Sequence, residues 1–275
     1  MCATRSTIRA WIAAVVLSLG LIAPAAAGPV ENAMAPYWRG DYATAMRLLR
    51  PIADEGNADA QLRLGHMYAS GQGVPQDDAT AVTWFRKATD QGNAAAQTYL
   101  GFMYQSGRGG PQDDAAAANW FRKAADQGYA MAQFLLGLMY VNGQGVSQDY
   151  AMAVTWVRKA ADQGYAPAQG RLGLMYLNGL GVAQDYETAV TWSRIAADQG
   201  DATGQSNLGF MYLNGQGVPQ DHVLAYVWFT LAAVAGNTDA PKNRALVATR
   251  MTPAQIAEAQ RIARERNFMA VVPDP

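Results

Sequence analysis

The chain has 275 residues, of which 50% are hydrophobic and 16% are charged, so it can bury a sizeable core and its composition is not that of a disordered protein. The charges of its 21 basic and 22 acidic residues nearly cancel, so the chain lacks the excess of positive charge that is typical of nucleic-acid-binding proteins. Because Cys2 is the only cysteine, disulfide bonds within the chain are excluded.

The first 27 residues have the pattern of a secretory signal peptide. Arg5 and Arg9 precede an apolar run over 10–22, and small residues follow Pro24 at 25–27. The run is short for a membrane span, although an uncleaved N-terminal anchor is the alternative. We therefore expect cleavage after residue 27 and a periplasmic or secreted mature protein that does not insert into the membrane.

The rest of the chain is dominated by an internal repeat with a constant step of 36 residues. Three different markers keep this step over five units. The markers are a glycine after leucine (Gly65, Gly101, Gly137, Gly173, Gly209), a tryptophan (Trp84, Trp120, Trp156, Trp192, Trp228) and a second glycine (Gly92, Gly128, Gly164, Gly200, Gly236). We assign five repeats to 57–236, preceded by an atypical repeat over 28–56 with a shortened loop.

The unit at 165–200 shows what each repeat contains. "APAQGRLGLMYLN" predicts a first helix, "GLGVAQD" a connection and "YETAVTWSRIAAD" a second helix. Gly179 stands where a helix end requires a left-handed residue, and Asp185 is suited to cap the second helix. Each repeat is therefore predicted to be a helix-turn-helix unit.

The glycine in the middle of each first helix needs an explanation, because such a glycine costs about 1 kcal/mol relative to alanine. We expect the cost to be offset by close approach of the paired helix, with its tryptophan or alanine packed on bare backbone.

The C-terminal region, 237–275, is predicted to cap the array. Thr252-Pro253-Ala254-Gln255 has the form of a capping box with proline at the first helical position. We expect a helix over 253–267, preceded by a shorter helix near 239–249, because terminal repeats need an altered outer face.

These residues resemble the Sel-one-like repeats, relatives of the tetratricopeptide repeats. The unit at 129–164 carries the motif as Leu136-Gly137, Tyr140, Gly143, Gly145-Val146, Asp149, Ala153, Trp156, Lys159-Ala160-Ala161 and Gln163-Gly164. The resemblance implies an all-α fold, a right-handed superhelical solenoid of helix pairs. It also implies an adaptor for protein complexes, and the resemblance to several exported bacterial relatives implies a periplasmic regulator.

No constellation of residues suited to catalysis or to metal binding stands out. The two histidines, His66 and His222, lie in different repeats, and neither zinc-ligand spacing nor a nucleophile elbow is present. Glycine-rich loops can bind phosphate, but the loops of this chain carry aspartates such as Asp77 and Asp221, whose negative charge would repel a phosphate group. We expect a non-enzymatic protein without cofactor or metal.

Along the second helices, arginines four residues before aspartates (Arg86 and Asp90, for example) predict a ladder of solvated ion pairs.

The candidate partner site is the row of first-helix positions that vary between repeats, because first helices line the concave side in tetratricopeptide-like folds. An apolar floor with polar and aromatic edges suits a helix or an extended peptide of a protein partner. The candidate residues are Arg63, His66, Tyr99, Phe102, Phe134, Leu138, Arg171, Leu174, Asn207 and Phe210. Packing against the next repeat is the alternative for the Phe/Leu row.

Two other functions stay open at this point. Cysteine-rich secreted relatives suggest a hydrolase acting on β-lactam or cell-wall substrates, although this chain lacks their paired cysteines. Glycan binding by the aromatic residues is the other alternative, and the fixed positions of most of these aromatics argue for a structural role instead.

Overall fold

The computed structural model describes residues 28–271, with side chains up to residue 266, and all regular secondary structure in this range is helical. An N-terminal pair, α2 (Pro29–Trp38) and α3 (Tyr42–Asp54), precedes five pairs of equal length. These five are α4 (Ala58–Ser70) with α5 (Asp78–Asp90), α6 (Ala94–Ser106) with α7 (Asp114–Asp126), α8 (Ala130–Asn142) with α9 (Tyr150–Asp162), α10 (Ala166–Asn178) with α11 (Tyr186–Asp198), and α12 (Ala202–Asn214) with α13 (His222–Val234). The described chain is thus the all-α solenoid that the 36-residue period predicts.

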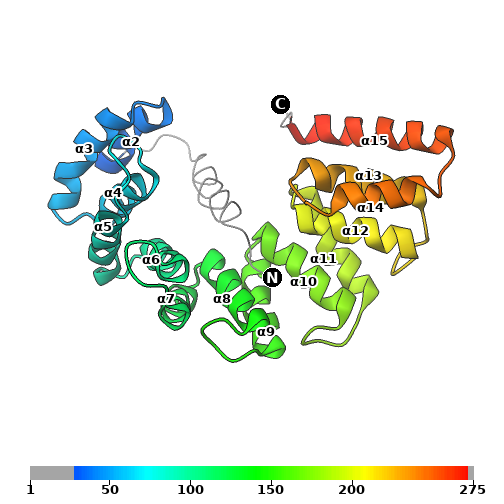
Figure 1. Cartoon of the computed structure of the whole chain (residues 1–275), viewed down its shortest axis with the longest axis horizontal. Coiled ribbons are helices and arrows are strands. Elements are labelled where there is room, and N and C mark those ends of the chain that lie inside the picture. Colours follow the sequence, from blue (N-terminus) through cyan, green and yellow to red (C-terminus); the bar gives the residue numbers. More distant parts are fainter. Residues whose placement is uncertain (1–27, 272–275) are drawn as a thin grey trace.

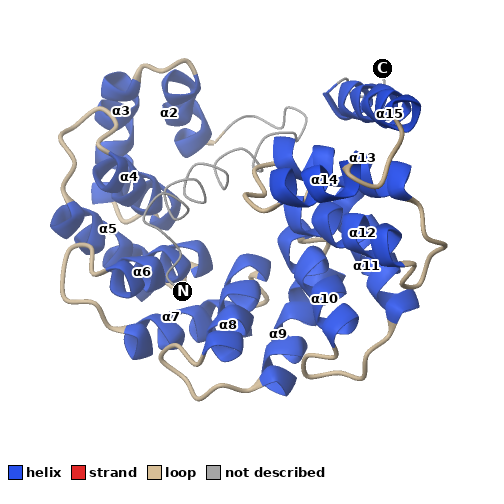
Figure 2. Cartoon of the chain, turned by 45° about the vertical axis from the view of Figure 1, so that its right-hand side comes forward, coloured by secondary structure: helices blue, strands red, loops and turns tan. Residues whose placement is uncertain are grey.

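The helix pairs stack side by side into a crescent (Figure 1). The first helices α6, α8 and α10 face the hollow of the crescent, and the second helices α7 and α9 lie on its outer side (Figures 1 and 2). The pair α2 and α3 forms one end. At the other end lie α14 (Ala240–Ala248) and α15 (Pro253–Val271), both of which were predicted.

The helix ends are set by the residues that the sequence analysis identified. The Asp185 carboxylate accepts a hydrogen bond from the Thr188 amide at 3.0 Å, which caps α11. Gly179 ends α10 with φ at 67°, in the left-handed region. At α15 the capping box closes in both directions, because the Thr252 amide donates to Gln255 Oε1 and the Gln255 amide donates to Thr252 Oγ1.

The mid-helix glycines allow the two helices of a repeat to approach closely, as predicted, but the residue they approach is a different one. A Cβ built on Gly101 would lie 2.6 Å from Cε1 of Phe121, the residue after Trp120 rather than the tryptophan itself or an alanine. The residues facing the five glycines are Phe85, Phe121, Val157, Ser193 and Phe229. The tryptophan points toward the neighbouring repeat instead, since Trp84 and Trp156 belong to core clusters that extend across repeats.

A ladder of glutamines, which the sequence analysis did not identify, joins the repeats through the interior. Gln133 is buried in α8, where it donates to the Ala125 carbonyl of the preceding repeat at 3.1 Å. Its Oε1 accepts from Gln163 Nε2 at the end of its own repeat at 2.7 Å. The same glutamine pair recurs as Gln61–Gln91, Gln97–Gln127 and Gln169–Gln199. The buried amides of Gln61, Gln133 and Gln169 therefore connect their repeats to the preceding helix pair.

This ladder ends at the last repeat, and its end gives a testable prediction. Position 235 holds alanine where the four earlier repeats hold glutamine, and Gln205 Oε1 is a buried acceptor with no partner among the described residues. An unsatisfied buried acceptor costs about 1–3 kcal/mol. We expect Ala235→Gln to raise the free energy of unfolding by about 1 kcal/mol in urea titrations. Ala235→Met, which matches the size but cannot donate, is the control, and an equal gain from it would contradict the explanation.

The charges on the outer helices do not form the predicted ladder of arginine–aspartate pairs. Arg86 donates instead to the Tyr104 hydroxyl of the next repeat at 3.0 Å, and Arg122 donates in the same way to Tyr140 at 2.5 Å. Arg158–Tyr176 and Arg194–Tyr212 repeat the contact. The arginines thus join adjacent repeats rather than turns of one helix. The expectation of i, i+4 ion pairs is wrong for this series because the tyrosine hydroxyl of the following first helix lies within reach.

Candidate functional site

The candidate residues of the first helices lie in successive repeats along the inner side of the crescent, but they differ in how far they are exposed. Phe102, Leu138, Leu174 and Phe210 are half-buried. Phe102 contacts Phe121 edge-on at a centroid distance of 5.3 Å. The apolar row therefore takes part in packing within its own repeats and also presents some of its surface to solvent.

Asn207, one of the candidate partner-binding residues, does not lie on the accessible surface of the inner face. It is buried, with 3% of its surface exposed, and its Nδ2 donates to the Gly170 carbonyl at 2.9 Å and to Ser193 Oγ at 3.3 Å. These bonds connect α12 to the preceding repeat. Asn207 therefore stabilises the stack and is not accessible to a partner.

His66 is also largely buried, at 9% exposure, with its ring edge-on to Tyr99 at a centroid distance of 5.7 Å. Tyr99 in turn stacks on Phe85 at 5.4 Å. The N-terminal candidates therefore form one aromatic cluster beside Arg63 rather than separate groove positions.

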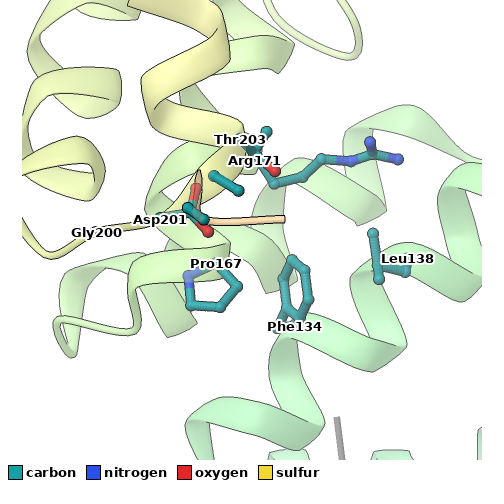
Figure 3. Close-up of a pocket in the computed structure, with 9 residues that line it drawn as sticks. Phe134, Leu138, Pro167, Arg171, Gly200, Asp201 and Thr203 are labelled. Atoms are coloured by element: carbon teal, nitrogen blue, oxygen red, sulfur yellow. The ribbon is translucent and has the colours of Figure 1, made fainter. Parts of the chain in front are cut away.

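A pocket of about 380 Å³ brings three other candidates together on the inner side (Figure 3). Phe134 and Leu138 come from α8, and Arg171 comes from α10. The other lining residues are Pro167, Gly200, Asp201, Ala202, Thr203 and Ala235. The pocket thus spans the inner ends of three consecutive repeats, and one guanidinium lies at its apolar wall.

The repeats differ in sequence next to this pocket. Position 170 of α10 holds glycine where α8 holds Phe134, and Gly170 is buried. The space next to Gly170 is taken by Asp201, whose Oδ1 a Cβ at position 170 would overlap. Gly170 therefore leaves room for Asp201, which lines the pocket.

Arg171 is the unusual charge of this pocket. Its side chain extends toward Leu138 and away from Asp201 (Figure 3), and it makes no hydrogen bond or ion pair with any described residue. Burial lowers the pKa of the guanidinium from its ordinary value, because partial desolvation disfavours the charged form. Such a charge favours an anionic group that reaches it from outside the chain.

Two tyrosines that sequence reasoning missed extend the surface toward the N-terminal end. Tyr129 and Tyr165 occupy the position before the first helices α8 and α10, and the Tyr165 ring meets Phe134 at a centroid distance of 5.6 Å. Burial raises the pKa of Tyr165 to about 12 and raises the pKa values of Tyr129 and Tyr99 as well. The phenols are therefore neutral and available for hydrogen bonds. Their equivalents elsewhere are Asn57, Asn93, Asp201 and Asn237, and this variation was the missed signal.

Asp201 has a pKa raised to about 6, because burial beside the pocket outweighs the hydrogen bonds from Gly204 and Thr203 amides that favour its charged form. Since the folded pKa lies above the unfolded value near 4, the carboxylate destabilises the fold above pH 6, and this cost disappears as pH falls toward 4.

This linkage predicts the effect of Asp201→Asn. Asparagine caps the same position in other repeats, as Asn57 does through the Ala60 amide. We expect the variant to be more stable by about 1–3 kcal/mol at pH 8, with the gain lost by pH 4. Urea titrations at pH 8, 6 and 4 measure it, with Asp185→Asn on an exposed cap as the control. A gain that did not depend on pH would contradict a raised carboxyl pKa.

Within residues 28–271, no helix has both the length and the apolar character that crossing a bilayer requires. No cluster of three or more potential metal ligands occurs among the same described side chains.

The fold and this inner surface define the protein as a helical solenoid repeat protein. A family model for the Sel1 repeat matches residues 58–93, 94–129, 130–165, 166–201 and 202–237. A Sel1 repeat protein from Oxalobacter formigenes, whose crystal structure is known, is 31% identical with a TM-score of 0.76, and the match covers 90% of this chain and 98% of that one. The chain therefore belongs to the Sel1 repeat family, whose members are typically scaffolds for protein interactions.

More distant structures share the fold. An immunity protein from Pseudomonas aeruginosa is 20% identical with a TM-score of 0.51, and the match covers 86% of this chain and 84% of that one. A second immunity protein from the same organism is 19% identical with a TM-score of 0.50, over 86% and 85% of the two chains. A comparison with curated proteins found no significant match.

Proposed function

We propose that this chain is an exported scaffold or adaptor without enzymatic activity, which binds a protein partner on the inner face of its crescent. The observation that carries the proposal is the pocket where Phe134, Leu138 and Arg171 of two repeats meet. It combines an apolar wall with an unpaired positive charge on a surface built from rigid helices. Such a surface suits a helix or extended segment of another protein.

The proposed partner is a sensor's extracytoplasmic domain or another component of a cell-envelope complex, so that the chain acts as a periplasmic regulator. Support comes from the sequence of residues 1–27, which lie outside the described residues. The comparisons offer no support for the alternative of a hydrolase acting on β-lactam or cell-wall substrates.

Site-specific photo-crosslinking in the native cell tests the location of the binding face. A photo-reactive amino acid placed at Leu138 or Thr203 would lie in the pocket, whereas one at Ile195 would lie on the outer helix α11, where 40% of Ile195 is exposed. We expect both pocket positions to give an adduct with the same protein and Ile195 to give none. Adducts from Ile195 alone, or equally from all three positions, would remove the inner face as the site.

Export is tested separately by fractionating cells and sequencing the N-terminus of the protein in the envelope fraction. The proposal expects a chain that begins at Gly28 and is released by osmotic shock. Full-length protein retained in the cytoplasm would overturn the proposed localisation and leave the proposed binding face standing.

A further inference from the structure

The distribution of charge over the five first helices is unusual and points to the chemistry of the partner. The helices α4, α6, α8, α10 and α12 contain Asp59, Arg63 and Arg171 as their only acidic, lysine or arginine residues. Asp59 is exposed and accepts a hydrogen bond from Asn93 Nδ2 at 3.0 Å. These five helices therefore carry two arginines among mostly uncharged side chains, and the carboxylate of Asp201, which caps α12, is the other charged group at the pocket.

Neither arginine is neutralised within the described part of the chain. The ion pairs there involve Arg50, Arg108 and Arg261. Arg63 is half-buried, and its Nε is shielded from solvent without a hydrogen-bond partner. Arg171 is half-buried at the pocket wall and is also unpaired. A partly desolvated guanidinium gains most from a carboxylate, which it can bind through two parallel hydrogen bonds.

Neutral aromatic side chains occupy the space between the two arginines. Tyr99 lies edge-on to His66 of α4, the helix that also carries Arg63, and Tyr129 and Tyr165 precede α8 and α10. Tyr165 contacts Phe134 at the edge of the pocket, and Phe134 lines the same pocket as Arg171. The surface thus runs from one arginine, over three tyrosines, to an apolar pocket and the second arginine.

We propose that this strip, from Arg63 to Arg171, binds a protein segment in which two acidic side chains flank bulky apolar ones. The carboxylates pair with the two arginines, and an apolar side chain enters the pocket beside Phe134 and Leu138. Since the arginines lie three repeats apart, one chain terminus cannot reach both, so the acidic groups are aspartate or glutamate side chains within the segment. This inference rests on the proposed binding face and adds the chemistry of its ligand.

Selection from a phage-displayed library of random dodecapeptides tests this chemistry without a known partner. Wild-type protein is expected to enrich peptides with acidic residues around Leu, Phe or Trp. The double variant Arg63→Gln/Arg171→Gln is expected to lose this enrichment, and Arg47→Gln, an exposed arginine on α3, is expected to keep it. Enrichment of basic or uncharged peptides, the same peptides with the double variant, or no enrichment at all would overturn the proposal.

A selected peptide then gives a quantitative test by fluorescence anisotropy. Replacing each of its acidic residues by the matching amide is expected to weaken binding about tenfold, and high salt is expected to weaken the parent peptide more than the amide form. The stability of Arg63→Gln/Arg171→Gln is measured in parallel by thermal melting, so that loss of binding is not confused with loss of fold. Equal affinities for the acid and amide peptides would contradict the pairing.

Failure of this inference is distinguishable from failure of the proposed function. If pocket crosslinks to a partner persist in Arg63→Gln/Arg171→Gln, the inner face binds its partner but acidic recognition is wrong. If no partner crosslinks to the pocket positions, the proposal that the inner face is the binding site is wrong. A homodimer in sedimentation that the double variant dissociates would assign the strip to a second copy of the chain, and would also overturn the proposal.

Discussion

Gly173→Leu is expected to lower the free energy of unfolding by more than about 3 kcal/mol, which is a large share of the stability of an ordinary domain. A Cβ at position 173 would lie 3.1 Å from the Ser193 amide nitrogen and 3.2 Å from the Ala189 carbonyl oxygen. It would also overlap the Ser193 hydroxyl. Because two of these neighbours are main-chain atoms of α11, they cannot rotate away, and the larger side chain must separate the two helices of the repeat.

Gly173→Ala separates this steric effect from helix propensity. Alanine gains about 1 kcal/mol from propensity, and its single methyl group requires a smaller shift of α11, so we expect a net loss of about 1 kcal/mol. Urea denaturation followed by circular dichroism measures both variants. Asn119→Ala and Asn119→Leu, at an exposed position within α7, are the matched controls and should change stability by less than about 0.5 kcal/mol. If both substitutions of Gly173 stabilised the protein, close helix approach would not be the reason for the glycine.

The fold could be predicted from the sequence almost to the residue because one pattern is repeated five times. Asp185 marks the start of α11 and Gly179 marks the end of α10 through local hydrogen bonding and backbone conformation, which do not depend on distant contacts. Contacts between repeats were not predictable in the same way. The period shows that Arg86 and Tyr104 recur, yet it does not show that they meet across a repeat boundary. For the same reason the residue opposite Gly101 was assigned to the wrong neighbour.

The site was harder to predict because it depends on exceptions to the repeat. Arg171 was predicted as an inner-face position and lines the pocket, whereas Asp201, which also lines it, fits beside the buried Gly170, and no motif indicates this glycine. Asn207 occupies the same position in its repeat as Arg171 does. Its side chain is nevertheless buried and donates hydrogen bonds to Gly170 and Ser193 of the preceding repeat. Tyr129 and Tyr165 were missed because they stand before the helices and not on the helical row.

Because adjacent repeats share one interior, we expect that an internal repeat can be removed as a unit. Removing 129–164 joins Gly128 to Tyr165, which preserves the Gly-Tyr step found at Gly128–Tyr129. It places α10 against α7, and the buried residues Ala168, Leu172 and Met175 take the places of Ala132, Leu136 and Met139. In a nearest-neighbour array this exchange leaves the helices at the new junction, α7 and α10, packed against neighbouring helices.

Removing half as much chain is expected to be far more damaging. Deletion of 147–164 takes away α9 and leaves α8 with its buried face, which includes Leu136 and Met139, uncovered. Thermal unfolding of the two deletion variants, followed by circular dichroism, is the most direct test. We predict a soluble protein with one cooperative transition after removal of 129–164, and an aggregating or non-cooperative product after removal of 147–164. Equal behaviour of the two variants would contradict the stacked interior and the binding face built on it.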